Sequence, residues 1–209
     1  NIGSTTYTSF ITCFAEGTEI DTGSGVCPVE EISPGQLIWT RDNGLAPVSW
    51  VGCADVEAKG AFAPVVFAPG SLGNTSELVV SQQHRMLLTG YPVELLFGTP
   101  DALIAAKHLC GLPGIALRPG GHVRYYHLMF DRHEIIRAHG VLSESFFVTP
   151  LSLRGLAQDA RTELLHLFPG FQTEEHGFGC TAAPTLKPHE AHVALHHLFG
   201  AAPRPALAA

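Results

Sequence analysis

The chain has 209 residues, of which 45% are hydrophobic and 15% are charged, and its formal net charge is −7. A chain of this length and apolar content can bury a core of its own, so we expect one globular domain with an appendage. The negative charge and the lack of a basic run argue against a nucleic-acid partner, and no apolar stretch is long enough for a membrane span.

Short runs of β-branched and aromatic residues, separated by Gly, Pro, Asn and Ser, recur through the first two thirds of the chain. Residues 18–29 predict a hairpin, because the turn residues 22–25 divide two such runs. The segment 42–44 reads Asp-Asn-Gly and predicts a second tight turn, since Asn and Gly tolerate positive φ. The pattern predicts an all-β body. Further strands are expected at 37–40, 46–51, 63–67, 77–80, 86–88, 123–130 and 134–138, with 101–109 either strand or helix and 111–121 a loop.

The pattern changes after Pro150. Apolar residues at helical spacing predict a helix over 155–168, which a Pro-Gly pair ends. A second helix is expected from about Pro188 to Phe199. The sequence therefore predicts a C-terminal two-helix appendage.

Five cysteines occur at irregular spacing, and there is no Cys-x-x-Cys pair. The odd number does not form a disulfide framework, and a structural zinc site of the usual kind is not expected. His192 and His196 share one face of the last helix and could bind zinc, but an ordinary polar helix face is the simpler interpretation. We therefore predict no metal and no cofactor.

The most informative pattern begins at Cys13. It reads CFAEGTEI at residues 13–20, continues as VEEISPGQLI at 29–38, and is followed by SQQH at 81–84. This pattern resembles the Hint (hedgehog/intein) autoprocessing domains, in particular a compact bacterial branch, from Cys13 to about Phe147. The resemblance implies a Hint-type, pseudo-symmetric horseshoe of short strands.

The arrangement of a cysteine with a distant histidine is one that activates a thiol, and here the target is the chain's own bond between Thr12 and Cys13. The thiol would attack the preceding carbonyl carbon and convert the amide into a thioester, which is an N-to-S acyl shift. The departing nitrogen needs a proton, and His84, held by Ser81, is the predicted general acid. The family usually has Thr at this position, and Ser81 keeps the hydroxyl; its alternative role is to cap a turn.

Activation of the thiol also needs a base, because a free cysteine is mostly protonated near neutral pH. In inteins an Asp within a Tyr/Phe-Asp-Leu run often assists, and the run Tyr126-His127-Leu128 resembles it. We therefore predict His127 as the base and Asp131 as the second candidate. His133 matches the histidine of the family's last strand pair with an offset of one residue. Hydrogen bonding to strand backbones is the alternative role of both histidines.

The sequence departs from splicing inteins at residues 143–146. Those proteins end in His-Asn followed by Cys, Ser or Thr, and the Asn side chain cyclises; here the segment reads SESF. Asn-driven C-terminal cleavage and full splicing are therefore not expected. The remaining reaction is single-turnover self-cleavage, in which water, an amine or a thiol accepts the acyl group.

Two other classes of function stay open. One is a Cys/His hydrolase that acts in trans, with Cys13 as nucleophile and His84 as base. The other is a catalytically silent Hint fold that serves as a binding module. Residues 1–12 favour autoprocessing, because that reaction needs an upstream segment.

The predicted organisation has three parts: an upstream segment at 1–12, a Hint autoprocessing domain at 13–149, and a helical appendage at 150–209. The resemblance implies a bacterial source and a place on an exported protein, although no export signal is visible and the compartment is left open. The expected partners are the chain's own upstream segment and the acceptor nucleophile.

Overall fold

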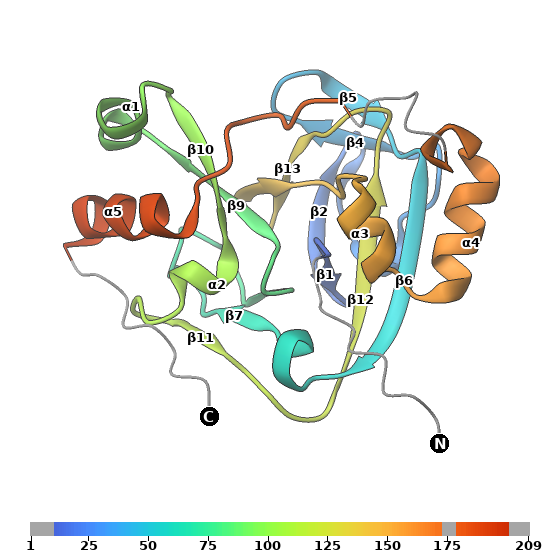
Figure 1. Ribbon diagram of the computed structural model, residues 1–209, viewed down its shortest axis with the longest axis horizontal. Helices are drawn as coiled ribbons and strands as arrows, with labels where there is room; N and C mark the ends of the chain where they lie inside the picture. The colour runs from blue at the N-terminus through green and yellow to red at the C-terminus, as the bar shows by residue number, and fades with distance from the viewer. Residues whose placement is uncertain (1–10, 173–178, 201–209) are drawn as a thin grey trace.

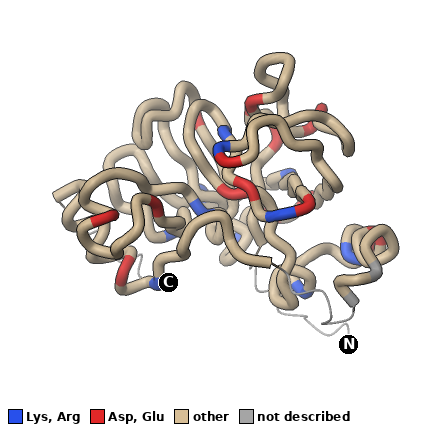
Figure 2. The backbone as a smooth tube through the Cα atoms, turned by 90° about the horizontal axis from the view of Figure 1, so that it is seen from above, with Lys and Arg blue, Asp and Glu red and all other residues tan. Residues whose placement is uncertain are grey.

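The computed structural model describes residues 11–172 and 179–200, and its strands form two antiparallel sheets with helices at the periphery (Figure 1). The predicted all-β body with C-terminal helices is confirmed, since strands dominate the described body. No helix among the described residues has the length and apolarity needed to cross a membrane. Figure 2 shows acidic and basic positions interleaved along the described chain.

The first sheet has the strand order β11-β7-β8-β1-β12-β6. Its central strand is very short, and Phe14 pairs with Val80 on one side and Tyr126 on the other. Segments far apart in sequence therefore meet on both sides of Cys13. The strands are β1 (Phe14–Ala15), β6 (Trp50–Glu57), β7 (Val65–Phe67), β8 (Leu78–Val80), β11 (Ile115–Leu117) and β12 (His122–Met129).

The second sheet has the order β10-β9-β14-β13-β2-β4-β5, with β3 paired to β2. The predicted hairpin at 18–29 and the predicted turn at 42–44 are both present. His139 and Gly140, both with positive φ, form the two-residue turn between β13 and β14. The strands are β2 (Glu19–Thr22), β3 (Gly25–Pro28), β4 (Leu37–Thr40), β5 (Gly44–Pro47), β9 (Arg85–Thr89), β10 (Asp101–Ala105), β13 (Ile135–Ala138) and β14 (Val141–Glu144).

Helices also occur within the body. The segment 101–109 contains both predicted states, because β10 leads directly into α2 (Ala106–Leu109). Helix α1 (Tyr91–Phe97) was not expected from the sequence, since seven residues are too few to establish a helical period. The predicted loop at 111–121 contains β11.

Among the described residues, the C-terminal part holds one more α-helix than the sequence predicts. The helix expected at 155–168 begins later, as α4 (Gln158–Leu167), and α3 (Pro150–Gly155) precedes it. Thr149 caps α3 by accepting a hydrogen bond from the Ser152 amide. The last helix, α5 (Pro188–Phe199), has the expected bounds. Single 3₁₀ turns are η1 (Val29–Glu31), η2 (Gly60–Phe62) and η3 (Pro169–Gln172).

The helices pack on two different parts of the body (Figure 1). Ala191 and Leu195 of α5 belong to the main core, on the side where α1 and α2 lie. Leu153 of α3 and Leu164 of α4 belong to a second core that contains Cys13. A fully buried leucine contributes about 2 kcal/mol by leaving water, so α3 and α4 are firmly held against the core that contains this cysteine.

Candidate active site

Cys13 lies directly before β1, and only 4% of it is exposed. Strand β8 ends at the residue before Ser81, and β12 contains His127, so the two strands that flank β1 bring both side chains to the cysteine. The thiol lies 3.6 Å from the carbonyl oxygen of Ile11. The sulfur is therefore enclosed on the N-terminal side of its own residue, facing the predicted scissile bond.

Ser81 holds the backbone on both sides of that bond. The amide of Cys13 donates to the Ser81 hydroxyl at 3.1 Å, and this hydroxyl donates to the carbonyl oxygen of Ile11 at 2.6 Å. The amide of Ser81 donates in turn to the carbonyl oxygen of Cys13 at 3.1 Å. One serine thus fixes the peptide units before and after Thr12.

His127 contacts both groups that the acyl shift would join. Its Nδ1 lies 2.9 Å from the carbonyl oxygen of Thr12, and its Nε2 lies 4.0 Å from Sγ of Cys13. A carbonyl oxygen only accepts hydrogen bonds, so Nδ1 carries the ring proton. Burial lowers the pKa of His127 to about 4, although the bond to Thr12 opposes this shift, and the ring is neutral at pH 7. Nε2 therefore presents a lone pair to the thiol.

The thiol itself rests in its protonated form. Burial raises the pKa of Cys13 well above the usual range, and the Ser81 hydroxyl offsets this only in part. A free thiolate is too costly in this environment. If this sulfur attacks a carbonyl carbon, loss of its proton must accompany the attack.

His84 contacts the same residue on its other side. Its Nδ1 donates to the carbonyl oxygen of Cys13 at 3.1 Å, and its Nε2 is buried without a partner among the described residues. Burial lowers the pKa of His84 to about 4. The sequence predicts that His84 protonates the Cys13 nitrogen, whereas the hydrogen bond in the structure goes to the Cys13 oxygen. That role stays a prediction.

Aromatic rings fix the orientation of the His127 ring. The Trp50 ring lies parallel to it, with centroids 6.4 Å apart and an interplanar angle of 4°, and Phe146 packs at 5.3 Å. Gly52 pairs with His127 across the strands. A Cβ atom at Gly52 would lie 2.1 Å from the Trp50 ring, so the ring occupies the space that a side chain would need.

Glu144, at the end of β14, is a site residue that sequence analysis missed. Its side chain is fully buried and accepts hydrogen bonds from the Thr12 hydroxyl at 2.7 Å and the Arg85 amide at 3.0 Å, both at Oε1. The Arg85 guanidinium donates to Oε2 at 2.9 Å. Burial raises the pKa of Glu144, but His133 and Arg85 outweigh this effect and hold it below its usual value. The sequence feature that could have indicated Glu144 is an acidic residue within a short apolar strand.

His133 reaches the site through Glu144. Its Nδ1 accepts from the Ala182 amide at 3.0 Å, so the proton lies on Nε2, which is 3.1 Å from Oε2 of Glu144. The angle of this approach is poor for a hydrogen bond, which makes it an electrostatic contact. Asp131, the second candidate for the base, is exposed and accepts from the Ser49 hydroxyl.

The structure therefore brings together five residues at one junction: Thr12, Cys13, Ser81, His84 and His127. His133 is linked to this junction through Glu144, which contacts Thr12. A family model described as Hint domain matches residues 12–150, which is more than half of the chain. The chain belongs to the Hint domain family. Among curated proteins, none matches it.

Several solved structures resemble this Hint domain. An intein-like domain from Clostridium thermocellum has 12% identity and a TM-score of 0.47, and the match covers 64% of this chain and 97% of that one. The AceL NrdHF class 3 split intein has 12% identity and a TM-score of 0.45, with coverage of 64% and 96%. The gp41-1 intein has 12% identity and a TM-score of 0.40, with coverage of 63% and 97%.

A cavity of about 470 Å³ lies beside the Thr12–Cys13 junction of the Hint domain. Cys13 and His127 form part of its wall, and so does the segment between α3 and α4. Most of its surface is apolar. The other lining residues are Ile11, Ala54, Val56, Glu57, Lys59, Phe62, Tyr125, Gly155, Ala157 and Gln158.

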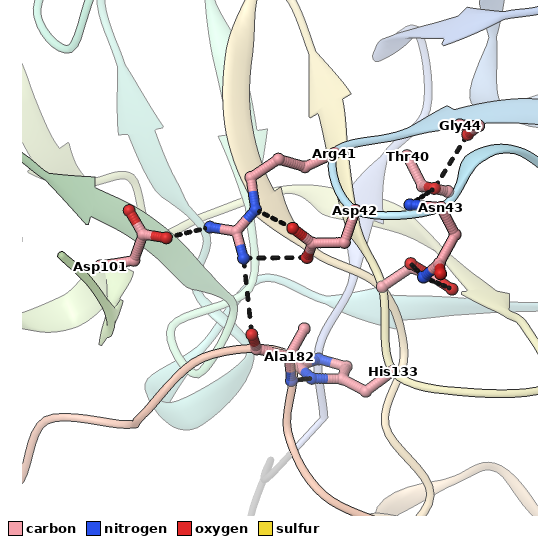
Figure 3. Close-up of polar contacts among 9 residues, drawn as sticks. Thr40, Arg41, Asp42, Asn43, Gly44, Asp101, His133 and Ala182 are labelled. Atoms are coloured by element: carbon pink, nitrogen blue, oxygen red, sulfur yellow. Dashed lines mark hydrogen bonds and ion pairs between the residues drawn. The ribbon is translucent and has the colours of Figure 1, made fainter. Parts of the chain in front are cut away.

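A second ionic cluster lies nearer the surface and is shown in Figure 3. The Arg41 guanidinium makes two contacts with Asp42, at 2.8 and 2.9 Å, and one with Asp101 at 2.6 Å. It also donates to the carbonyl oxygen of Ala182 at 3.5 Å. We call these four residues the surface cluster, and Thr12, Arg85, His133 and Glu144 the buried cluster.

The described residues contain no group of three or more His, Cys, Asp or Glu side chains placed to hold a metal ion. His192 and His196 are exposed on α5. The five cysteines are free thiols.

Proposed function

We propose that this self-processing domain cleaves its own chain between Thr12 and Cys13 by an N-to-S acyl shift. The position of His127 carries this proposal, because one neutral ring presents a lone pair to the thiol and a proton to the carbonyl oxygen. Ser81 supports it by fixing the backbone on both sides of the bond.

The first step forms the bond between Sγ of Cys13 and the carbonyl carbon of Thr12. As the sulfur attacks, the thiol proton moves to Nε2 of His127. The carbonyl oxygen gains negative charge, and the Nδ1 proton that already contacts it stabilises this charge. The same side chain thus acts as base and as oxyanion donor.

The second step breaks the bond between the Thr12 carbon and the Cys13 nitrogen. The nitrogen takes up a proton, so the net change is one proton moved from sulfur to nitrogen. The Ser81 hydroxyl, 3.1 Å from this nitrogen, can pass the proton on. His84, which contacts the other end of Cys13, is the proposed proton donor; it would have to regain its proton from protonated His127, so that both rings end neutral.

Water, an amine or a thiol then attacks the acyl carbon of the thioester and takes up the acyl group, while the carbon–sulfur bond breaks and Cys13 regains its thiol proton. The cavity beside Cys13 offers such an acceptor a route to the acyl carbon. Because residues 143–146 contain no Asn, the reaction ends with cleavage and does not splice. In this proposal residues 1–12 are released, 13–149 process the chain, and 150–209 form an appendage.

Nucleophile-induced cleavage tests the proposal. The purified chain is incubated with dithiothreitol or hydroxylamine, and its intact mass is followed over time. We expect loss of residues 1–12 from the native chain and none from Cys13→Ala. Cys53→Ala is the matched control, since it removes an exposed thiol and leaves the junction intact.

The alternatives predict different results. An unchanged mass after long incubation contradicts self-cleavage and favours a silent binding module. Turnover of an added thioester or ester, with the chain itself intact, favours a Cys/His hydrolase that acts in trans.

A further inference from the structure

We propose that Glu144 selects a hydroxyl-bearing residue, threonine or serine, at the position directly before the cleaved bond. This inference rests on the proposed function and assigns it a substrate preference. Glu144 is then a specificity-determining residue, because it contacts the acyl residue of the scissile bond.

The contact between Thr12 and Glu144 is short and buried. The Thr12 hydroxyl donates to Oε1 at 2.7 Å, across 132 positions of sequence. Thr12 is 9% exposed and the Glu144 side chain is fully buried, so water is poorly placed to replace either partner. A hydrogen bond to a buried carboxylate is among the stronger polar contacts in a protein.

The other partners of Glu144 keep it charged and in place. Arg85 contacts both carboxylate oxygens, through its amide and its guanidinium. His133 lies against Oε2, which leaves Oε1 directed at residue 12. The position before the bond therefore faces a fixed acceptor that requires a donor.

Different side chains at position 12 would meet this acceptor differently. Serine keeps the hydroxyl, whereas valine keeps the shape of threonine and leaves Oε1 short of one donor. Aspartate or glutamate would place two carboxylates together, and lysine or arginine would compete with Arg85. The acceptor thus favours β-hydroxy residues over the other classes.

The same contact also bears on the reaction. Thr12 is held through its hydroxyl by Glu144 and through its carbonyl oxygen by His127. These two contacts fix the carbonyl carbon relative to the sulfur of Cys13. A residue without the hydroxyl keeps only one of them, so fewer molecules have the geometry for attack.

A double-mutant cycle on the full chain tests the inference. Thr12→Ser, Thr12→Val, Glu144→Gln and the Val/Gln double variant are compared by rate of hydroxylamine cleavage and by urea unfolding. We expect Thr12→Ser to cleave within about 3-fold of the native chain and Thr12→Val to cleave about 10- to 100-fold more slowly. In the Glu144→Gln background a neutral amide oxygen replaces the charged acceptor, so the difference between Thr and Val should shrink by about 3- to 10-fold.

The outcomes separate this inference from the proposed function. Equal rates for Thr12→Val and the native chain, or an equal loss in both Glu144 backgrounds, overturn selection by Glu144 while self-cleavage stands. Absence of cleavage in the native chain overturns both. The unfolding data then show whether the Thr12–Glu144 contact still couples the two positions energetically.

Discussion

The buried cluster and the surface cluster use the same ionic chemistry in different surroundings. Around Arg41, the side chains of Arg41, Asp42 and Asp101 are 21%, 44% and 27% exposed. In the buried cluster, the side chains of Glu144 and His133 are 0% exposed, Thr12 is 9% exposed, and the Arg85 side chain is the most exposed at 31%. If a charged side chain loses its ionic partner, water can therefore take that partner's place in the surface cluster but not in the buried cluster.

This difference separates a structural role from a chemical one. The surface cluster joins the β4–β5 turn, β10 and the segment before α5, and the Ala182 amide links it to His133 of the buried cluster by a hydrogen bond of 3.0 Å (Figure 3). The buried cluster contacts Thr12 itself. Substitutions in the buried cluster should thus affect both the stability of the fold and the rate of cleavage, and substitutions in the surface cluster should affect neither strongly.

The largest effect is expected from His127→Gln. Removal of the proposed base and oxyanion donor should slow hydroxylamine-induced cleavage by about 10²- to 10⁴-fold, which is the usual contribution of a positioned general base. Arg41→Met is the control on the surface cluster and should cleave at the native rate. If the His127 variant cleaves as fast as the native chain, the imidazole takes no part in the reaction.

The next effect is on stability. Glu144→Ala leaves Arg85 and His133 without their shared partner, and we expect it to lower the free energy of unfolding by about 3–5 kcal/mol. Urea denaturation measures this change. A loss below 1 kcal/mol, similar to that from Asp101→Ala, would show that burial does not distinguish the two clusters.

Acidification should weaken the junction. His84 and His127 have a pKa of about 4 in the folded chain and the usual value of 6.5 when unfolded. The unfolded chain therefore binds more protons between these values, and stability falls as the pH drops from 6.5 towards 4. Each histidine contributes up to about 3 kcal/mol to this fall. Urea unfolding of His127→Gln at pH 6.5 and pH 4 should show a smaller fall in the free energy of unfolding than the native chain shows. An unchanged fall would contradict the lowered pKa of His127.

The smallest effect is expected at the surface cluster. Arg41→Met should lower the free energy of unfolding by no more than about 1 kcal/mol, because its ion pairs are partly exposed. In 1 M NaCl the difference from the native chain should shrink, since salt screens exposed charges. A loss of unfolding free energy above 3 kcal/mol that salt does not change would show that the ion pairs of Arg41 behave like those of the buried cluster.

Local pattern was sufficient to predict much of the fold. The hairpin at 18–29, the turn at 42–44 and helix α5 follow from turn residues and periodicity, which act over a few residues. Helix α1 was missed because it is too short to show a period. The start of α4 was misplaced because the break at 156–157 contains no strong helix-breaking residue.

The candidate site was predictable only in part. The pattern placed Ser81 and His127 with Cys13, and the structure brings them together. It gave no reason to choose Glu144, because the importance of that carboxylate depends on Thr12 and Arg85, which only the folded chain brings to it. Burial and pairing of a charge are properties of the tertiary structure.

Gly52 leaves room for the indole of Trp50, and the indole lies parallel to the His127 ring. Even one methyl group at that position would displace the indole and, with it, one wall of the imidazole. The missing Cβ atom at Gly52 on β6 thus helps to set the angle at which Nε2 of His127, the proposed base, faces the sulfur of Cys13. A change from glycine to alanine, conservative by size, would act on the chemistry without touching any group that takes part in it.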